Sequence, residues 1–370
     1  MKMTPAETQY FALLRAALWG TPLHVNMKID WKSVMQLAEY HGNIVLLSDV
    51  AAQMSDDNEP SSEMLDRMQR VMRSNLLHQM RLRQILIPAV QLLRQHSIEP
   101  VLLKGFGLAL LYPNPSLRQF SDIDLFVGLE DFHEACTLLR SLPGSYNWGE
   151  EVDSGRHYNI EFGQYPMEIH RVSADVENAK DSAIYASIER EGLKEHLQHV
   201  SLDGFDISVP SKEFTVFFTF FHAWHHFLTT GVGWRQLSDL AMALHIYHNQ
   251  LDMNKLHGWI TAMQLMQPWQ TFGYLLVQCL GLPETEMPFF DASCHRRAIR
   301  LYERIMKEGD FRRERKFKNH RPKRRLWQRI HAFIGIFIEF FHTAEVFPRQ
   351  AFFEMLDSLR HGFEKKSKKK

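Results

Sequence analysis

Cysteine is scarce in this chain, with three residues among 370. Cys136, Cys279 and Cys294 are too few and too far apart for a disulfide framework or a Cys-x-x-Cys metal site. We expect them to be reduced thiols in the core or at the surface. The sequence therefore gives no indication of a small, disulfide-stabilised secreted domain.

Long apolar segments are also absent. The longest one near the C-terminus covers residues 333–341, is interrupted by Glu339 and is well short of the ~20 residues that a membrane-spanning helix needs. The first residues contain no apolar stretch of the length found in signal peptides. We therefore expect a cytoplasmic protein without a transmembrane segment.

The chain also lacks net charge, because 43 Lys and Arg residues balance 43 Asp and Glu residues. A general attraction to nucleic acid is therefore not expected. The charge is locally uneven, since residues 296–329 contain 15 basic and 4 acidic residues and so have a formal net charge of +11. Such a segment can bind RNA, an acidic protein or an anionic membrane surface, and it can equally be a solvated linker.

The stretch at residues 101–127 carries the strongest chemical signal. It has the pattern of a short buried strand, a glycine turn, an apolar helical patch and a second strand that begins near Ile123. Asp122 and Asp124 lie at the start of this second strand. Because alternate residues of a strand project to the same face, the two carboxylates are expected to point together.

Two adjacent carboxylates repel each other, and a bound cation or a shared proton relieves the repulsion. Mg²⁺ fits, because it prefers oxygen ligands and is usually held by one or two carboxylates together with substrate phosphates. Glu168, in a short strand-like segment after Pro166, offers a third carboxylate. The sequence therefore predicts a metal site formed by Asp122, Asp124 and Glu168.

Four blocks, in order along the chain, resemble one known family. They are Leu103-Lys104-Gly105, then Tyr112 with Arg118 and Ser121-Asp122-Ile123-Asp124-Leu125, then Glu168-Ile169-His170, then residues 231–239. The arrangement is similar to the bacterial uncharacterised nucleotidyltransferase family, within the superfamily that includes DNA polymerase beta and the aminoglycoside nucleotidyltransferases. The resemblance covers about residues 30 to 280.

The order of the elements and this resemblance predict an α+β fold, with a small mixed-sheet nucleotidyltransferase core embedded between N-terminal and C-terminal helical regions. The expected regions are a helical region at 1–95, the α/β core at 96–210, a helical domain closing the pocket at 211–295, and a basic, aromatic helical region at 296–370 with a disordered tail.

The resemblance implies an enzyme that moves a nucleoside monophosphate from a nucleoside triphosphate to an acceptor and releases pyrophosphate. Asp122, Asp124 and Glu168 would hold two Mg²⁺ ions, and Glu168 could assist deprotonation of the acceptor. The acceptor is open, and a small molecule, a peptide or a protein all fit such a site. Nucleic acid is possible as an acceptor but is not favoured.

Contacts with the nucleotide and its phosphates are expected from six residues: Lys104, Gly105, Arg118, Ser121, His170 and Arg235. The wider superfamily usually has Gly-Ser or Gly-Gly at the turn, whereas Phe106 follows the glycine here. No serine hydroxyl is available at that position, so Lys104 or Arg118 would supply the contact. Both cations also have a second possible role, which is to pair with the aspartates.

Other pocket residues have open roles as well. Arg235 either reaches phosphate or pairs with Asp239, four residues later in a predicted helix. His157, Tyr158 and Asn159 precede the Glu168 strand and either line the pocket or pack across the sheet.

Helical periodicity predicts helices within residues 4–50, over residues 62–95 on the back of the sheet, and over residues 212–229. Asp203-Gly204 predicts a hairpin at residues 200–209. His222 and His226 would share one face of the third helix, where they either bind a transition metal or form local hydrogen bonds beside an aromatic core.

A second function class stays open beside the enzyme. A catalytically silent module with the same fold would use its basic segment at residues 296–329 to bind RNA or a partner protein. The presence of all three carboxylates favours the enzyme.

Overall fold

The computed structural model describes residues 1–21, 28–54, 58–146, 156–174, 176, 179–309, 340–341, 343–352 and 355. The part of the basic segment beyond residue 309 and the predicted disordered tail at the C-terminus lie outside these residues. No helix within the described ranges is both long enough and apolar enough to cross a membrane.

A mixed β-sheet of six strands lies at the centre of the α/β part, in the order β3-β4-β2-β1-β6-β5. β2 runs parallel to β4 and antiparallel to β1, and β6 runs parallel to β1. The predicted α+β class with a mixed sheet is therefore confirmed. The strands are β1 (Val101–Leu102), β2 (Ile123–Phe126), β3 (His157–Phe162), β4 (Tyr165–His170), β5 (Gln198–Leu202) and β6 (Phe205–Val209).

The predicted hairpin is confirmed as β5 and β6. Asp203 and Gly204 both have positive φ, 52° and 84°, as the two-residue turn of such a hairpin requires. The sequence did not show where this hairpin would lie. In the structure β6 pairs with β1, so the hairpin extends the same sheet.

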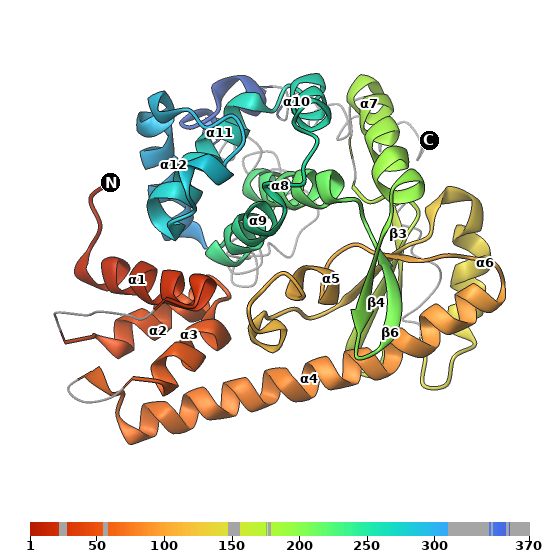
Figure 1. Cartoon of the computed structure of the whole chain (residues 1–370), viewed down its shortest axis with the longest axis horizontal. Helices are drawn as coiled ribbons and strands as arrows, with labels where there is room; N and C mark the ends of the chain where they lie inside the picture. The colour runs from red at the N-terminus through yellow and green to blue at the C-terminus, as the bar shows by residue number, and fades with distance from the viewer. Residues whose placement is uncertain are drawn as a thin grey trace, which may run out of the picture.

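Helices surround the sheet and form a separate layer above it (Figure 1). The main ones are α1 (Pro5–Trp19), α2 (Trp31–Tyr40), α3 (Ile44–Ala52), α4 (Ser62–Gln95), α5 (Phe106–Ala109), α6 (Gly128–Arg140), α7 (Ala179–Arg190), α8 (Lys212–Thr229), α9 (Trp234–Tyr247), α10 (Met253–Ala262), α11 (Met266–Leu275) and α12 (His295–Glu308). A short 3₁₀ turn, η2 (Pro115–Leu117), precedes β2.

The long helix α4 links the two halves of the molecule. It begins where Ser61 accepts a hydrogen bond from the backbone of Met64, and its 34 residues span about 50 Å. In Figure 1 it runs along one edge of the molecule from α3 to α6. Its C-terminal half packs with α6 against one face of the sheet, where Leu86 and Leu93 share a hydrophobic cluster with Leu125. The predicted position on the back of the sheet is therefore confirmed.

A second hydrophobic cluster joins elements that are far apart in the sequence. It contains buried side chains of α1 to α3 together with those of α8 to α12. The N-terminal helices therefore share one core with the helices after residue 211. Together these helices form one helical body. Val101 and Phe126 also belong to this cluster, so the second face of the sheet contacts this helical body.

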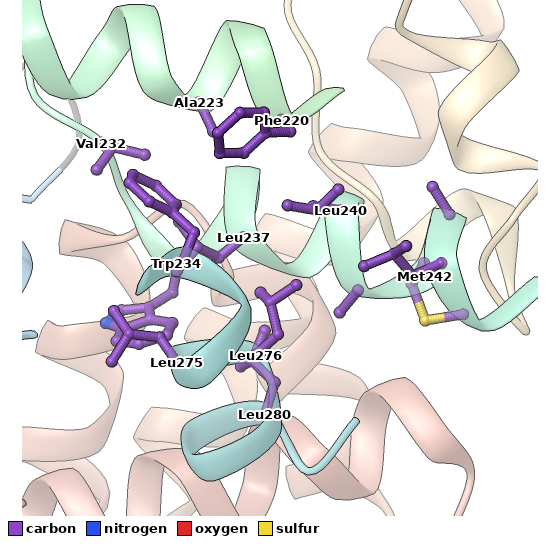
Figure 2. Close-up of a cluster of buried hydrophobic side chains, with 14 of the residues drawn as sticks. Phe220, Ala223, Val232, Trp234, Leu237, Leu240, Met242, Leu275, Leu276 and Leu280 are labelled. Carbon is purple, nitrogen blue, oxygen red and sulfur yellow. The ribbon is translucent and has the colours of Figure 1, made fainter. Parts of the chain in front are cut away.

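Aromatic side chains of α8 form the centre of the helical body. Ser211 caps this helix by accepting a hydrogen bond from the backbone of Phe214. Phe220 contacts the rings of Trp269 and Phe272 edge-on, at centroid distances of 5.1 and 5.8 Å. Figure 2 shows Phe220 and Ala223 of α8 above Trp234 and Leu237 of α9. These aromatic contacts therefore fix the position of α8 in the helical body.

We expect Phe220→Ala to lower the free energy of unfolding by about 3–5 kcal/mol, because it leaves a cavity where a fully buried ring contacts two others. Urea unfolding followed by circular dichroism measures the change. Leu77→Ala is the control, since that side chain is 56% exposed on α4 and its loss should cost no more than about 0.5 kcal/mol. Equal losses in both variants would contradict the described core.

Candidate functional site

The parallel pairing of β2 with β4 places acidic residues from distant segments side by side. Asp124 is the direct cross-strand partner of Glu168, and Phe126 is the partner of His170. Side chains alternate along each strand, so Asp122 and Asp124 share a face with Glu168. The intervening Ile123 and Leu125 lie in the cluster on the opposite face. The structure therefore brings together the three carboxylates that the sequence predicted to converge.

Asp124 lies at the centre of the site and is fully buried. Its Oδ1 lies 3.0 Å from Lys104 Nζ and 3.0 Å from His170 Nε2. Burial alone would raise the pKa of Asp124, but the nearby Lys104 and His170 outweigh it and hold this pKa well below its usual value. The lowered pKa favours the ionised form of Asp124, and Lys104 and His170 are the two side chains that face its charge.

His170 bridges two of the carboxylates. Its Nε2 is also 3.3 Å from Glu168 Oε2, and its side chain is 1% exposed. Burial would lower the pKa of His170, but the hydrogen bonds to Asp124 and Glu168 raise it above its ordinary value. The structure thus directs His170 Nε2 to carboxylates, and the predicted contact with phosphate stays a prediction.

Asp122 and Glu168 experience different surroundings. Burial raises the pKa of Asp122, and the neighbouring charge of Asp124 raises it further. Burial also acts to raise the pKa of Glu168, but the hydrogen bond from His170 makes the net change a decrease. Of the three carboxylates, Asp122 is therefore the one whose surroundings disfavour the ionised form.

These features fit a divalent cation. Within the described residues, Asp124 Oδ2 is buried and has no hydrogen-bond partner. A cation beside it would supply the missing partner and would also favour ionisation of Asp122. Three carboxylates offer the oxygen ligands that Mg²⁺ prefers. Asp122, Asp124 and Glu168 are the residues that would hold it.

The turn after β1 approaches the site closely. Gly105 has φ of 62°, and a Cβ atom there would lie 3.4 Å from the backbone oxygen of Asp122. A side chain would therefore be strained by its backbone conformation and crowded by the strand that carries the aspartates. Lys104, just before this glycine, keeps a pKa above its ordinary value, because its neighbours Asp124 and Asp122 outweigh the effect of burial.

Arg118 lies in a different environment from the one predicted. Its Nε and Nη2 donate to Asp239 Oδ1 and Oδ2 at 2.6 and 2.8 Å, and its Nη1 donates to the backbone oxygen of Gly105 at 3.0 Å. Tyr112 donates to the same Asp239 carboxylate at 2.7 Å. The guanidinium is buried and directed at α9. It therefore attaches the segment before β2 to the helical body, and its predicted contact with the triphosphate gains no support from this position.

A cleft of about 720 Å³ reaches Ser121, the residue before Asp122, although none of the three carboxylates is among its lining residues. It is lined by residues of α2, α4 and α9 and by the segment that leads into β2, including Arg70, Ser74, His78, Ser121 and Arg235. Ser121 and Arg235 therefore line this cleft, and their predicted contacts with the nucleotide and its phosphates stay predictions. The α4 residues were not predicted, although Arg70, Ser74 and His78 recur every fourth residue and so mark one polar face of that helix.

Arg235 is held at the start of α9. Its backbone N–H donates to the carbonyl of His41 at 3.1 Å. Gly42 has φ of 73°, and a Cβ atom there would lie 3.1 Å from Arg235 Nε. The absence of a side chain at this glycine therefore leaves room for the stem of Arg235 in the wall of the cleft.

Three histidines named from the sequence have distinct places. His157 is the cross-strand partner of His170, and its Nε2 lies 4.0 Å from Glu168 Oε2. His222 and His226 share a face of α8 as predicted, with ring centroids 4.4 Å apart, and His226 Nδ1 lies 2.8 Å from the hydroxyl of Thr230. Burial, and then the positive charge of Lys104, lower the pKa of His222 well below its ordinary value. α8 therefore extends toward Lys104 at the site.

We expect Arg118→Met to lower the free energy of unfolding by about 3–5 kcal/mol, because it leaves the buried carboxylate of Asp239 without its main partner. Adding Asp239→Leu should recover part of this loss, since no buried charge then remains. Urea unfolding of the two single variants and the double variant measures the coupling. Arg67→Ala removes an exposed pair with Glu39 and should cost less than about 1 kcal/mol. Additive losses at Arg118 and Asp239 would contradict the ion pair.

The raised pKa of His170 predicts a pH-dependent stability when divalent ions are removed by a chelator. The stabilisation from protonated His170 is complete below its ordinary pKa of 6.5 and is lost as the pH rises through the higher folded value. Urea unfolding between about pH 6 and pH 9 should show this loss in the parent protein and a flatter profile in His170→Gln. His133→Gln, on the exposed side of α6, should keep the parent profile. Parallel profiles for the parent and His170→Gln would refute the assignment.

Three comparisons with known proteins bear on the family of this chain. A solved structure similar to this chain is that of an antigenic nucleotidyltransferase-like protein from Paracoccidioides brasiliensis, with 13% identity over 54% of this chain and 92% of that one. Its TM-score of 0.34 is too low to define a common fold. The comparison with curated proteins gives no match. A sequence model of the family described as uncharacterised nucleotidyltransferase matches residues 27–281. Since this match covers more than half of the chain, the protein belongs to the uncharacterised nucleotidyltransferase family.

Proposed function

We propose that this protein is a cytoplasmic, magnesium-dependent nucleotidyltransferase of the polymerase beta type. It transfers a nucleoside monophosphate from a nucleoside triphosphate to an acceptor and releases pyrophosphate. The observation that carries the proposal is the pairing of Asp124 with Glu168 on adjacent parallel strands, next to Asp122. Membership of a nucleotidyltransferase family supports it.

Each residue of the site has a separate role in the proposed reaction. Asp122, Asp124 and Glu168 would hold the two Mg²⁺ ions, and Glu168 would also assist removal of the acceptor's proton. When bound, the ions would activate the attacking oxygen and stabilise the leaving pyrophosphate. Lys104 remains protonated next to Asp124, so it can stabilise charge on the triphosphate.

The cleft that reaches Ser121, the residue before Asp122, is the proposed entry for substrate. Arg70 and Arg235 line it, while the nearby carboxylate of Glu39 is paired with Arg67. This arrangement suits a substrate that carries phosphate or another anionic group. Ser121, which precedes the first aspartate, lies at the same wall and can contribute a hydroxyl.

The direct test supplies radiolabelled nucleoside triphosphates, Mg²⁺ and a cell extract, and then identifies what becomes labelled. We expect transfer of label by the parent protein and a loss of about a hundredfold or more in Asp124→Asn, because the fully buried carboxylate at the centre of the site is gone. Asp66→Asn, on the exposed side of α4, is the matched control and should transfer label as the parent does.

Binding is measured separately from transfer by thermal unfolding. Mg²⁺ with a nucleoside triphosphate should raise the Tm of the parent and of Asp66→Asn, but not that of Asp124→Asn. A catalytically silent module would show no metal-dependent shift and no labelled product. That result would refute the proposed enzyme.

A further inference from the structure

The face of the sheet that carries the carboxylates also carries nitrogen donors. His157 on β3 lies directly opposite His170 on β4, and Glu168 is two residues before His170 on the same face. The two imidazole rings are 5.2 Å apart at their centroids. Three adjacent strands thus present two histidines beside the acidic residues. The proposed magnesium site does not use these histidines.

The donor atoms of this group are close enough to share one ion. The ligand atoms of His157, Glu168 and His170 all lie within 4.8 Å of one another. Glu168 Oε2 is 3.3 Å from His170 Nε2 and 4.0 Å from His157 Nε2. Donors bound to one small divalent ion at about 2.0–2.2 Å lie roughly 3–3.5 Å apart. Small side-chain adjustments would therefore close the group around an ion.

The surroundings favour a charge between these atoms. His170 Nε2 lies within 3.3 Å of oxygens from both Asp124 and Glu168, so two carboxylates would compensate a cation bound at this nitrogen. Asp124 is fully buried, and its Oδ2 has no partner within the described residues. A divalent metal ion bound to the imidazole nitrogens would place two positive charges beside these carboxylates.

The chemistry of the donors selects the kind of ion. Mg²⁺ prefers oxygen ligands and sheds its water reluctantly, whereas imidazole nitrogens suit Zn²⁺, Co²⁺ and related first-row transition metals. Two histidines and one glutamate with a remaining open position form a known type of zinc ligand set.

We propose that His157, Glu168 and His170 form a binding site for a first-row transition-metal ion, with Zn²⁺ as the expected occupant. The site shares Glu168 with the proposed magnesium site, but its existence does not depend on nucleotidyl transfer.

The test uses Co²⁺ as a spectroscopic probe. The full chain is first treated with a chelator, and Co²⁺ is then added in the absence of nucleotide. Co²⁺ bound to imidazole nitrogens should give visible absorption bands that persist in about a hundredfold excess of Mg²⁺. His157→Gln should weaken the Kd for Co²⁺ by about 10- to 100-fold. His157 is suited to substitution because it is 20% exposed and lies at the edge of the group. His133→Gln, an exposed histidine on α6, should bind Co²⁺ as the parent does.

Two results would overturn the proposal. One is displacement of Co²⁺ by Mg²⁺ at similar concentrations, which would indicate oxygen ligands alone. The other is an unchanged Kd in His157→Gln with a lowered Tm, which would mean that this histidine only packs across the sheet. Transfer of radiolabel in Mg²⁺ is scored with the parent protein as well. Transfer by the parent without Co²⁺ bands refutes the metal site alone, and Co²⁺ bands without transfer refute the enzyme alone.

Discussion

The mutual repulsion of three carboxylates on one face of the sheet is the constraint on which this structure depends. Asp124 is fully buried beside Glu168, and burial together with the charge of Asp124 raises the pKa of Asp122. Bringing such charges together in a poorly solvated place is costly unless cations compensate them. Lys104, in the turn after β1, and His170, in β4, provide that compensation. The same arrangement suits a site whose substrates bring metal ions and phosphates.

The helical body packs against the face of the sheet that includes Val101 and Phe126. The α1 to α3 helices and the helices from α8 onward share one hydrophobic core, although about 160 residues of chain separate them. The ion pair of Arg118 with Asp239 connects this body to the segment before β2, and the cleft opens beside that connection. The ion pair therefore attaches the segment that leads to Asp122 to the helical body.

Much of the local structure followed from the sequence. The alternation around Asp122 and Asp124 identified a strand, the pair Asp203-Gly204 identified a hairpin, and the spacing of apolar residues identified the helix from Ser62 to Gln95. These signals are local, because propensity, capping and side-chain alternation act over a few residues. The role of Arg118 was not predictable in this way. Its partner, Asp239, is 121 residues away, and a buried bidentate pair leaves no mark in the local pattern.

The sequence by itself determined which residue types are available at the site, namely the acidic pair, Glu168 and the neighbouring lysine and histidine. Only the tertiary structure decided that β2 and β4 lie parallel and in register, so that Asp124 faces Glu168 and His157 faces His170. It also decided that the N-terminal helices form one wall of the cleft. The physical reason is that strand register and helix packing are set by burial of apolar faces between segments far apart in the chain, whereas a sequence pattern records only which face each segment will bury.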